Sequence, residues 1–318
     1  MKEELVPQDE ENKLKKELGY VESASFSQVT WSRFRKNRVA TVGLSIVVFM
    51  FLVTFVGPLF APYPKSDISS IVADSANLVA PNFRHPFGTD IQGYDVFSEI
   101  IYGASTAIYV GVASSLLATV MAIIVGGFAG YYGGRVENIL MRLTDAFLVI
   151  PVLLFLLYLA RIANDPKVTW FPIKGVNVIV LILAVFGWAG IARMVRAEFM
   201  KLRNMEYVNA AVTLGATPRR IIFRHILPNA LPSIIVVTAL NISANIIAEA
   251  SLSFLGFGDP TEVTWGRILQ INSTNYTIAW WTALFPGLAI FITALGFNLL
   301  GDGLRDALDP RLRGEVKK

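Results

Sequence analysis

Six stretches of this chain are apolar for long enough to cross a lipid bilayer as helices. A membrane span needs about 20 mostly apolar residues. Only 16% of the 318 residues are charged and 54% are hydrophobic, whereas a soluble domain carries about 25% charged residues. The expected spans are 39–60, about 105–129, a short one from about 141 to 161, about 176–191, about 231–255 and about 280–300. We therefore predict an all-α membrane protein with six transmembrane helices. A membrane barrel needs alternating strands of about ten residues, and these apolar runs are continuous.

Basic residues give the predicted orientation of the spans. With the N-terminus inside the cell, 22 of the 28 Lys and Arg residues fall on the inner side, as the positive-inside rule requires. This N-in, C-in orientation also explains the isoelectric point near 9.2 without nucleic-acid binding. The predicted segments are a cytoplasmic tail (1–38), a first span (39–60), an extracytoplasmic loop (61–103), a five-helix core (104–304) with a cytoplasmic loop at about 196–230, and a C-terminal tail (305–318).

Several classes of activity are disfavoured by what the sequence lacks. The chain has no cysteine and two histidines, His85 and His225, so thiolate metal sites are excluded and a histidine-rich metal centre is not expected. It contains no phosphate-binding loop of the form G-x-x-x-x-G-K-[ST]. It also has no nucleophile–base constellation. We therefore expect no enzymatic activity and no cofactor on this chain, and any ATP that drives it must bind elsewhere.

The N-terminal tail leaves two interpretations open. It is either a disordered, solvated tail with a basic stop before the first span, or it ends in a short amphipathic helix around "FSQVTWSRFRKNR". In the second case Trp31 and Phe34 would lie at the level of the lipid headgroups beside the arginines.

A polar and basic segment, residues 207–232, interrupts the apolar pattern. The residues before it favour a helix throughout, and Gly215 is the preferred type for a left-handed helix end. Thr217 and Pro218 then read as the N-cap and first residue of a second, amphipathic helix. Pro228 and Pro232 mark the predicted entry to the fifth span. We therefore predict a helix, a sharp turn and another helix on the cytoplasmic side.

Small side chains line one face of the first of these helices. Ala210, Ala211 and Leu214 lie at helical spacing and allow another backbone to approach closely. Two interpretations remain open from these residues alone. Either this face docks against another protein, or the loop folds back on its own helix ends.

The same segment resembles the "EAA" loop of permease subunits in ATP-binding-cassette (ABC) importers. The matching positions are Asn209-Ala210-Ala211, Gly215 and Leu227-Pro228. Stretches similar to the oligopeptide/dipeptide subfamily extend the resemblance from about residue 31 to residue 313: "HPFGTD" (85–90), "EYVNAA" (206–211), "FRHILPN" (223–229), "AEASLSFLGFG" (248–258) and "FNLLGDGLRDALDPRLR" (297–313).

This resemblance implies the type I ABC importer permease fold in a prokaryotic inner (plasma) membrane. It implies two ATPase subunits that hold ATP and Mg²⁺, a second homologous permease subunit and an extracytoplasmic solute-binding protein. The helix that ends at Gly215 would be the coupling helix that docks on an ATPase. Peptides are the implied cargo, and the same machinery also carries nickel complexes, glutathione or oligosaccharides in this subfamily. A self-sufficient secondary transporter or a channel is the alternative from a different class.

The coupling segment departs from the family pattern at its first motif position. Asn209 replaces the usual Glu, so it cannot form a charge-assisted pair with an ATPase arginine, and Glu206 lies one turn earlier on nearly the same face. The predicted ATPase-contacting set is Glu206, Asn209, Ala210, Ala211, Leu214 and Gly215.

Charged and aromatic residues near the spans lead to three further expectations. Glu249 lies deep in the fifth span and should face protein or water rather than lipid, where it either lines a pathway or hydrogen-bonds a neighbouring helix. Arg142 and Asp145, three residues apart, are expected to form a local ion pair. Trp265, Trp280 and Trp281 are expected to anchor the membrane interface.

Overall fold

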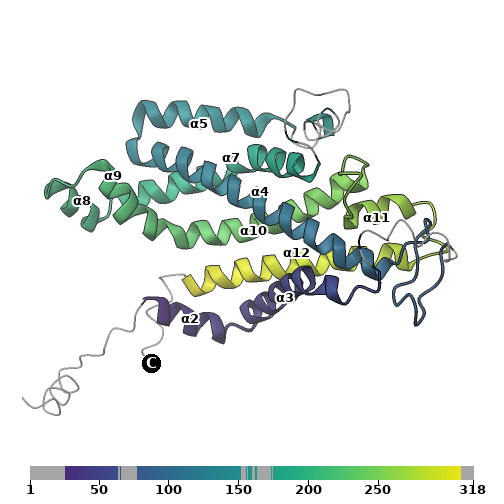
Figure 1. The fold of residues 1–318 in the computed structure, drawn as a ribbon. Coiled ribbons are helices and arrows are strands. Elements are labelled where there is room, and N and C mark those ends of the chain that lie inside the picture. The colour runs from purple at the N-terminus through teal and green to yellow at the C-terminus, as the bar shows by residue number, and fades with distance from the viewer. Residues whose placement is uncertain are drawn as a thin grey trace, which may run out of the picture.

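The computed structural model describes residues 26–63, 65, 77–151, 155, 157–159, 162, 173 and 175–308. The described chain is built of helices (Figure 1). Their bounds are α2 Phe26–Lys36, α3 Arg38–Phe55, η1 Gly57–Leu59, α4 Val96–Tyr132, α5 Gly134–Val149, α7 Val176–Arg203, α8 Glu206–Thr213, α9 Pro218–Arg220, the π-helical η3 Ile221–Ile226, α10 Leu227–Phe254, α11 Trp265–Asn272 and α12 Trp281–Leu308.

Five helical stretches of the described chain are long and apolar enough to span a membrane. They are Arg38–Phe55, Val96–Tyr132, Val176–Arg203, Pro218–Phe254 and Trp281–Leu308. Each overlaps one of the predicted spans. The remaining predicted span, about 141–161, begins within α5, but most of it beyond residue 151 lies outside the described residues.

Helix ends differ from the predicted segment boundaries for local reasons. α4 begins at Val96, inside the loop predicted to run to residue 103, because the Asp95 carboxylate caps it by accepting from the Ser98 N–H at 2.8 Å. α12 continues to Leu308, past the predicted start of the tail at 305.

The two prolines of the predicted fifth-span entry do not end a helix. Helical structure runs without a break from Pro218 to Phe254. The π-helical turn lies directly before Pro228, and the Leu227 N–H bonds to the Ile222 carbonyl, five residues earlier. Because proline has no N–H to donate, this wider turn carries the chain past Pro228 without a break.

The helices lie side by side in an elongated bundle (Figure 1). α4 contacts α7 and α10, and α12 contacts α3 and α10. α8 and α9 lie at one end of the bundle, whereas α11 lies at the other end, beside the residues that precede α4 (Figure 1). The two ends therefore present different surfaces, one built from the α7–α10 connection and one from α11 and its neighbours.

Glycines allow the backbones of α4 and α7 to approach very closely. A Cβ atom added at Gly126 would lie 2.3 Å from the Ala192 carbonyl oxygen, and one added at Gly130 would lie 2.6 Å from the Arg196 carbonyl oxygen. The glycine pair at 126–127 therefore serves close helix contact. The next pair, Gly133 and Gly134, adopts φ +68° and +55° and makes the turn from α4 to α5.

Ion pairs join α5 to α7. The Arg196 guanidinium donates through Nε to Glu137 Oε1 at 2.7 Å, and the Arg193 guanidinium bonds to the Asp145 carboxylate. The expected local pair between Arg142 and Asp145 is therefore wrong. α5 lies against α7, and Asp145 bonds to a guanidinium on that helix instead of one on its own.

Two of the three tryptophans expected at the membrane interface are buried instead. Trp265 is fully buried and donates its indole N–H to the Ile100 carbonyl at 3.0 Å. Trp281 donates to the Thr89 carbonyl at 3.0 Å. The Trp265 bond thus connects α11 to α4, and the Trp281 bond connects α12 to the residues that precede α4. Only Trp280 of the three is exposed.

The segment before the first span is helical from Phe26, as the amphipathic interpretation requires, and residues 1–25 lie outside the described chain. Phe34 is buried against Ala40 and Ala307, so it does not reach the headgroups. Trp31 is exposed and stacks on Phe34 with 5.9 Å between ring centroids. α2 thus packs partly on the bundle.

The glycine contact between α4 and α7 yields a matched test. Alanine favours a helix over glycine by about 1 kcal/mol, so Gly190→Ala, where no atom lies within 4 Å of the new Cβ, should maintain or raise the unfolding temperature. Gly126→Ala should lower it, because overpacking typically costs about 1–3 kcal/mol. Thermal unfolding of the full chain in detergent measures both. Equal shifts in the two variants would contradict the close contact.

Candidate functional site

The connection between α7 and α10 begins with a break in helix. The sequence favours one helix through residue 214, but α7 ends at Arg203 and Met205 is extended, with φ −76° and ψ 147°. The Asn204 and Met205 N–H groups bond back to the last turn of α7. Two residues separate the end of α7 from the start of α8, and α8 therefore runs in a new direction. We call residues 204–217 the α7–α10 loop.

One buried side chain attaches α8 to the bundle. Val208 is 1% exposed, and it is the buried member of α8. It belongs to one apolar cluster with Phe199 and Leu202 of α7 and with Ile221 and Ile226 of the following helix. α8 is therefore fixed at one point between the two helices that it connects, while the rest of its surface stays open.

Gly215 ends α8 in a Schellman motif. Its φ is +80°, its N–H bonds to the Val212 carbonyl at 2.9 Å, and the Ala216 N–H bonds to the Ala211 carbonyl at 3.0 Å. No atom lies within 4 Å of a Cβ built at this position. Glycine is therefore required here by the backbone conformation and not by lack of space.

Thr217 starts the next helix, as predicted. Its hydroxyl accepts from the Arg220 N–H at 3.4 Å, and Pro218 occupies the first helical position. The helix then continues through the π turn into α10, where the Asn229 side chain donates to the His225 carbonyl at 2.6 Å. The predicted sharp turn between two helices is confirmed, and the second helix is continuous with a candidate span.

The predicted docking residues lie together on the outside of α8. Leu214 is 87% exposed, Glu206, Asn209 and Ala210 are exposed, and Ala211 is half-buried. Exposed apolar side chains that gather in one patch mark interaction sites, and Tyr207 and Val212 of the same helix are exposed as well. Within the described chain α8 thus does not fold its small face back onto the bundle.

Three exposed apolar side chains of this region were not predicted from the sequence. Tyr207 and Val212 lie on α8 beside the alanines, and Phe223, 61% exposed, lies on the following helical turn. Arg219, Arg220 and Arg224 surround Phe223 and line with it a shallow hollow of about 430 Å³. The sequence could have indicated the exposure of Phe223. In "PRRIIFR" (218–224) three apolar residues lie between arginines, so one of the three must lie on the same helix face as the arginines.

Glu249, the other candidate, lies far from this loop. About 30 helical residues separate it from Pro218, which corresponds to about 45 Å along a helix. Glu249 is 1% exposed, and its Oε1 accepts from the Ser253 hydroxyl at 2.6 Å. Its Oε2 has no hydrogen-bond partner among the described residues, although Thr264 lies nearby. The structure thus places Glu249 inside the protein and away from lipid.

Polar side chains of α4 form hydrogen bonds with polar side chains of α10. Asn245 donates to Ser114 at 2.8 Å and to Ser115 at 3.0 Å, and the hydroxyls of Thr119 and Thr238 lie 2.9 Å apart. Such bonds between helices are typical of membrane proteins. No group of three or more His, Asp or Glu side chains suited to a metal ion occurs in the described part of the chain.

Comparison with known proteins identifies similar families and relatives. Residues 122–314 match the family described as "Binding-protein-dependent transport system inner membrane component", and residues 25–81 match "N-terminal TM domain of oligopeptide transport permease C". The chain is 39% identical over 297 residues to the dipeptide transport system permease protein DppC of Bacillus subtilis (strain 168), covering 92% of this chain and 88% of that protein.

Two further relatives have similar coverage. Identity to the oligopeptide transport system permease protein OppC of the same Bacillus subtilis strain is 39% over 282 residues, which is 88% of each chain. Identity to the glutathione transport system permease protein GsiD of Pectobacterium atrosepticum is 36% over 284 residues, which is 89% of this chain and 90% of that protein.

The burial of Glu249 yields a prediction about its replacement. Glu249→Gln keeps the shape and the bond from Ser253, so the chain should assemble in the membrane at close to the normal level. Glu249→Leu removes the acceptor and leaves the buried Ser253 hydroxyl without it, which typically costs about 1–3 kcal/mol, so the amount of folded protein should fall. Detergent extraction followed by size-exclusion chromatography measures folded protein. Normal folded levels of both variants would show that the carboxyl group contributes nothing to stability.

Proposed function

Because this chain belongs to the binding-protein-dependent transport system inner membrane components, we propose that it is the permease subunit of an ATP-driven importer that carries peptides. It is a multi-pass protein of the inner membrane and is not itself catalytic. The family description implies a solute-binding protein and other transporter subunits as partners. We propose two ATPase subunits, which hold ATP and Mg²⁺, and a second, homologous permease subunit.

The exposed end of α8 is the observation that carries this proposal. A lipid-embedded chain without a nucleotide-binding loop needs a contact to a soluble motor. α8 is a short helix whose buried Val208 fixes it to the bundle, and Gly215 ends it in a tight turn. Leu214, beside this turn, is 87% exposed. Ala210 and Ala211 beside it allow close approach. These features suit insertion of α8 into a groove of an ATPase, with Arg219 and Arg220 at the rim.

The connections of α8 suggest how motion would pass into the membrane. α7 leads directly into α8, and the helix after Gly215 runs without interruption to Phe254. A displacement of α8 by closing ATPases would therefore move α7 and α10 together. Asn209 takes part as a neutral, exposed polar residue, and Glu206 supplies the negative charge of this surface. The departure from the usual motif thus changes one contact without removing the docking surface.

Peptides are the proposed cargo because two relatives at 39% identity are named for dipeptide and oligopeptide transport. Glutathione, itself a tripeptide, is a second candidate, because the GsiD relative is 36% identical. Nickel complexes and oligosaccharides are further candidate cargoes of the same kind of transporter. A secondary transporter or a channel would leave the exposed α8 surface without a role.

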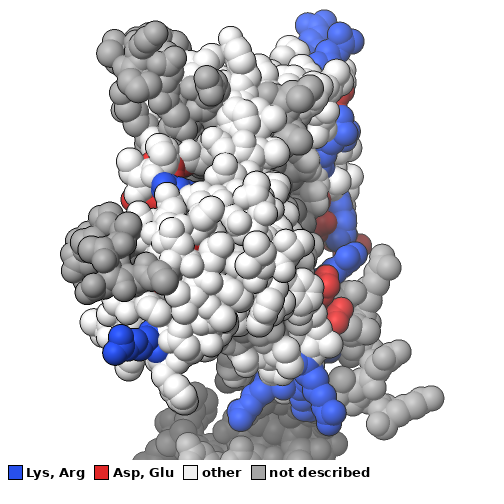
Figure 2. Space-filling view, turned by 90° about the vertical axis from the view of Figure 1, so that its right-hand side faces the viewer, with Lys and Arg blue, Asp and Glu red and all other residues white. Residues whose placement is uncertain are grey.

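We propose six spans with both termini in the cytoplasm. The basic residues of the α8 end, among them Arg219, Arg220 and Arg224, support this orientation through the positive-inside rule. The opposite end, which faces the viewer in Figure 2, is largely uncharged over its centre, and Lys and Arg gather toward one edge and below. The third of the six proposed spans would be formed by the second half of α5 and the residues that follow it.

Orientation can be tested with a reporter enzyme that is active only outside the cytoplasm. Fused after Lys318, it should be inactive, because an even number of spans returns the C-terminus to the side of the N-terminus. Fused after Asn275, between α11 and α12, it should be active. Activity at Lys318 together with inactivity at Asn275 would invert the orientation, and activity at both sites would contradict the proposed span count.

A pair of glycines provides the test of the coupling role. Gly215 and Gly256 each end a helix in a Schellman motif, at φ +80° and +83°, and neither has an atom within 4 Å of a built Cβ. Valine should strain the two sites equally, by about 1–2 kcal/mol. They lie at opposite ends of the bundle. We expect Gly215→Val to lose ATPase subunits and peptide uptake, and Gly256→Val to retain the ATPase subunits.

Pull-down of the ATPase subunits from detergent and uptake of a labelled dipeptide measure the two effects. Ala211→Asp, which places a charge on the close-fitting face of α8, should act like Gly215→Val while the chain stays in the membrane. If Gly215→Val and Ala211→Asp both keep normal ATPase retention and uptake, α8 is not the coupling helix.

A further inference from the structure

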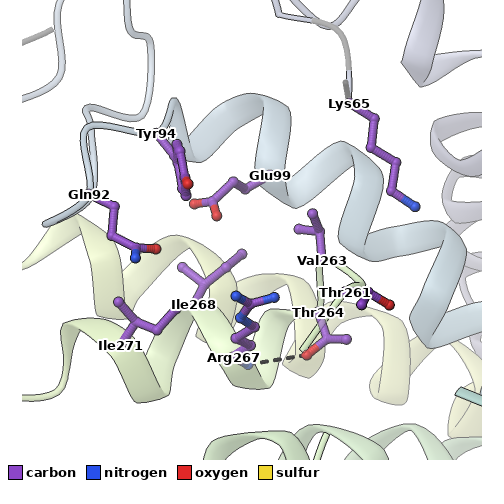
Figure 3. Close-up of a pocket in the computed structure, with 10 residues that line it drawn as sticks. All are labelled: Lys65, Gln92, Tyr94, Glu99, Thr261, Val263, Thr264, Arg267, Ile268 and Ile271. Carbon is purple, nitrogen blue, oxygen red and sulfur yellow. Dashed lines mark hydrogen bonds between the residues drawn. The ribbon is translucent and has the colours of Figure 1, made fainter. Parts of the chain in front are cut away.

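A hollow of about 270 Å³ lies at the end of the bundle opposite α8. The first turn of α4 forms one side and α11 forms the other, while the residues before α4 contribute Gln92 and Tyr94 (Figure 3). Val263, Ile268 and Ile271 form an apolar wall. Neither the coupling role of α8 nor the buried Glu249 uses this hollow.

One buried carboxylate lines the hollow and has an unsatisfied oxygen. Glu99 lies in the first turn of α4 and is 6% exposed, and its carboxylate extends toward the Tyr94 side chain (Figure 3). Its Oε2 has no hydrogen-bond partner among the described residues. Leaving a buried acceptor unpaired is costly, and more so for a charged group. A donor that enters the hollow would therefore gain more here than at an exposed carboxylate.

The neighbouring acids are already occupied by the fold. Asp90 Oδ1 accepts from the Gln92 N–H at 2.8 Å and from the Tyr94 N–H at 2.7 Å, and Asp95 accepts from the N–H and hydroxyl of Ser98. Burial raises the pKa of Asp90 to about 6, which reflects how little water reaches this region. Asp90 and Asp95 thus add negative potential around Glu99 without competing for its ligand.

Arg267 supplies the complementary charge on the facing helix. Its Nη1 donates to the carbonyls of Pro260 and Glu262, and these bonds hold the guanidinium beside the hollow. The guanidinium lies across the space from Glu99 (Figure 3). Lys65, the other cation of the lining, is paired with Glu262 at 2.5 Å. The hollow therefore presents one free acceptor and one fixed cation on opposite walls.

We propose that this hollow binds a primary ammonium group, with the Glu99 carboxylate as its acceptor and Arg267 as the partner of a carbonyl or carboxylate on the same ligand. A metal ion would need several oxygen ligands, whereas Glu99 alone offers a free carboxylate oxygen. The volume is below the range of about 300–1,000 Å³ for drug-sized ligands, so the hollow takes an end group. The apolar wall suits an aliphatic side chain beside the ammonium.

Two sources can supply this chemistry at the membrane surface: the amino terminus of a peptide and the headgroup of phosphatidylethanolamine. The peptide source rests on the proposed function, whereas the ammonium chemistry does not.

The first experiment titrates the full chain in nanodiscs made only of phosphatidylcholine and phosphatidylglycerol. L-Alanyl-L-alanine should bind, and N-acetyl-L-alanyl-L-alanine, which lacks the ammonium, should bind at least tenfold more weakly. Glu99→Gln has the same shape without the charge and should weaken binding of the free dipeptide at least tenfold. Glu198→Gln, an acid of α7 that pairs with Lys201 and does not line the hollow, should leave binding unchanged. Isothermal titration calorimetry measures all four affinities, and size-exclusion chromatography confirms that each variant is folded.

The second experiment tests the lipid source. The full chain is purified from membranes that contain phosphatidylethanolamine, and native mass spectrometry counts the retained lipid. Glu99-dependent retention of phosphatidylethanolamine, with no dipeptide binding in the first experiment, assigns the ammonium to the lipid. Glu99-dependent dipeptide binding assigns it to the peptide. If neither ligand depends on Glu99, the proposal is overturned.

A third measurement separates this proposal from the proposed transport function. Peptide uptake by the whole transporter should be abolished in Gly215→Val while the affinity of the hollow for its ammonium ligand stays normal. Peptide uptake by the wild type, with no Glu99-dependent binding of either ligand, would overturn only the ammonium site. Glu99-dependent binding in a wild-type transporter that takes up no peptide would overturn only the transport function.

Discussion

The contact between α4 and α7 at Gly126 and Gly130 sets the geometry on which the rest of the bundle depends. Added Cβ atoms would lie 2.3 and 2.6 Å from carbonyl oxygens of α7, so the two backbones approach more closely than a residue with a Cβ atom would allow. Small residues at such contacts replace the hydrophobic driving force that lipid removes. The α5–α7 ion pairs then fix the next helix to this pair. α7 is therefore held along its length before the chain turns into α8.

The rigidity of α7 gives the α7–α10 loop a defined place. Phe199 and Leu202 of α7 share one apolar cluster with Val208 of α8 and Ile221 of the following helix. The loop can therefore leave Leu214 exposed without losing its position. Because Val208 is buried and Gly215 ends the helix in a tight turn, α8 can move only together with the helices on either side of it. The polar segment that interrupts an apolar chain is thus explained by what it must contact outside the membrane.

Local rules predicted the elements that depend on neighbours in the chain. The apolar runs, the left-handed Gly215 and the Thr217 cap all follow from residues within a few positions. The described structure has five of the six predicted runs, the Gly215 turn and the Thr217 cap where they were expected. The predicted pair of Arg142 with Asp145 was wrong because Arg193, 48 residues away, is closer in space. Trp265 and Trp281 looked like interface anchors, yet their indoles bond to carbonyls of distant segments. Val208 and Glu99 were missed because their importance lies in long-range packing, which spacing does not reveal.

The two ends of the bundle are mechanically connected through α10. Its helical run begins at Pro218 beside the α7–α10 loop and ends at Phe254, where α11 packs against it so closely that a Cβ at Gly266 would lie 2.1 Å from the Ala250 carbonyl oxygen. α11 carries Arg267, whereas Glu99 belongs to α4. A shift of α10 relative to α4 would therefore change the separation of these two charges. A ligand that bridges them would therefore favour one arrangement of α10 relative to α4.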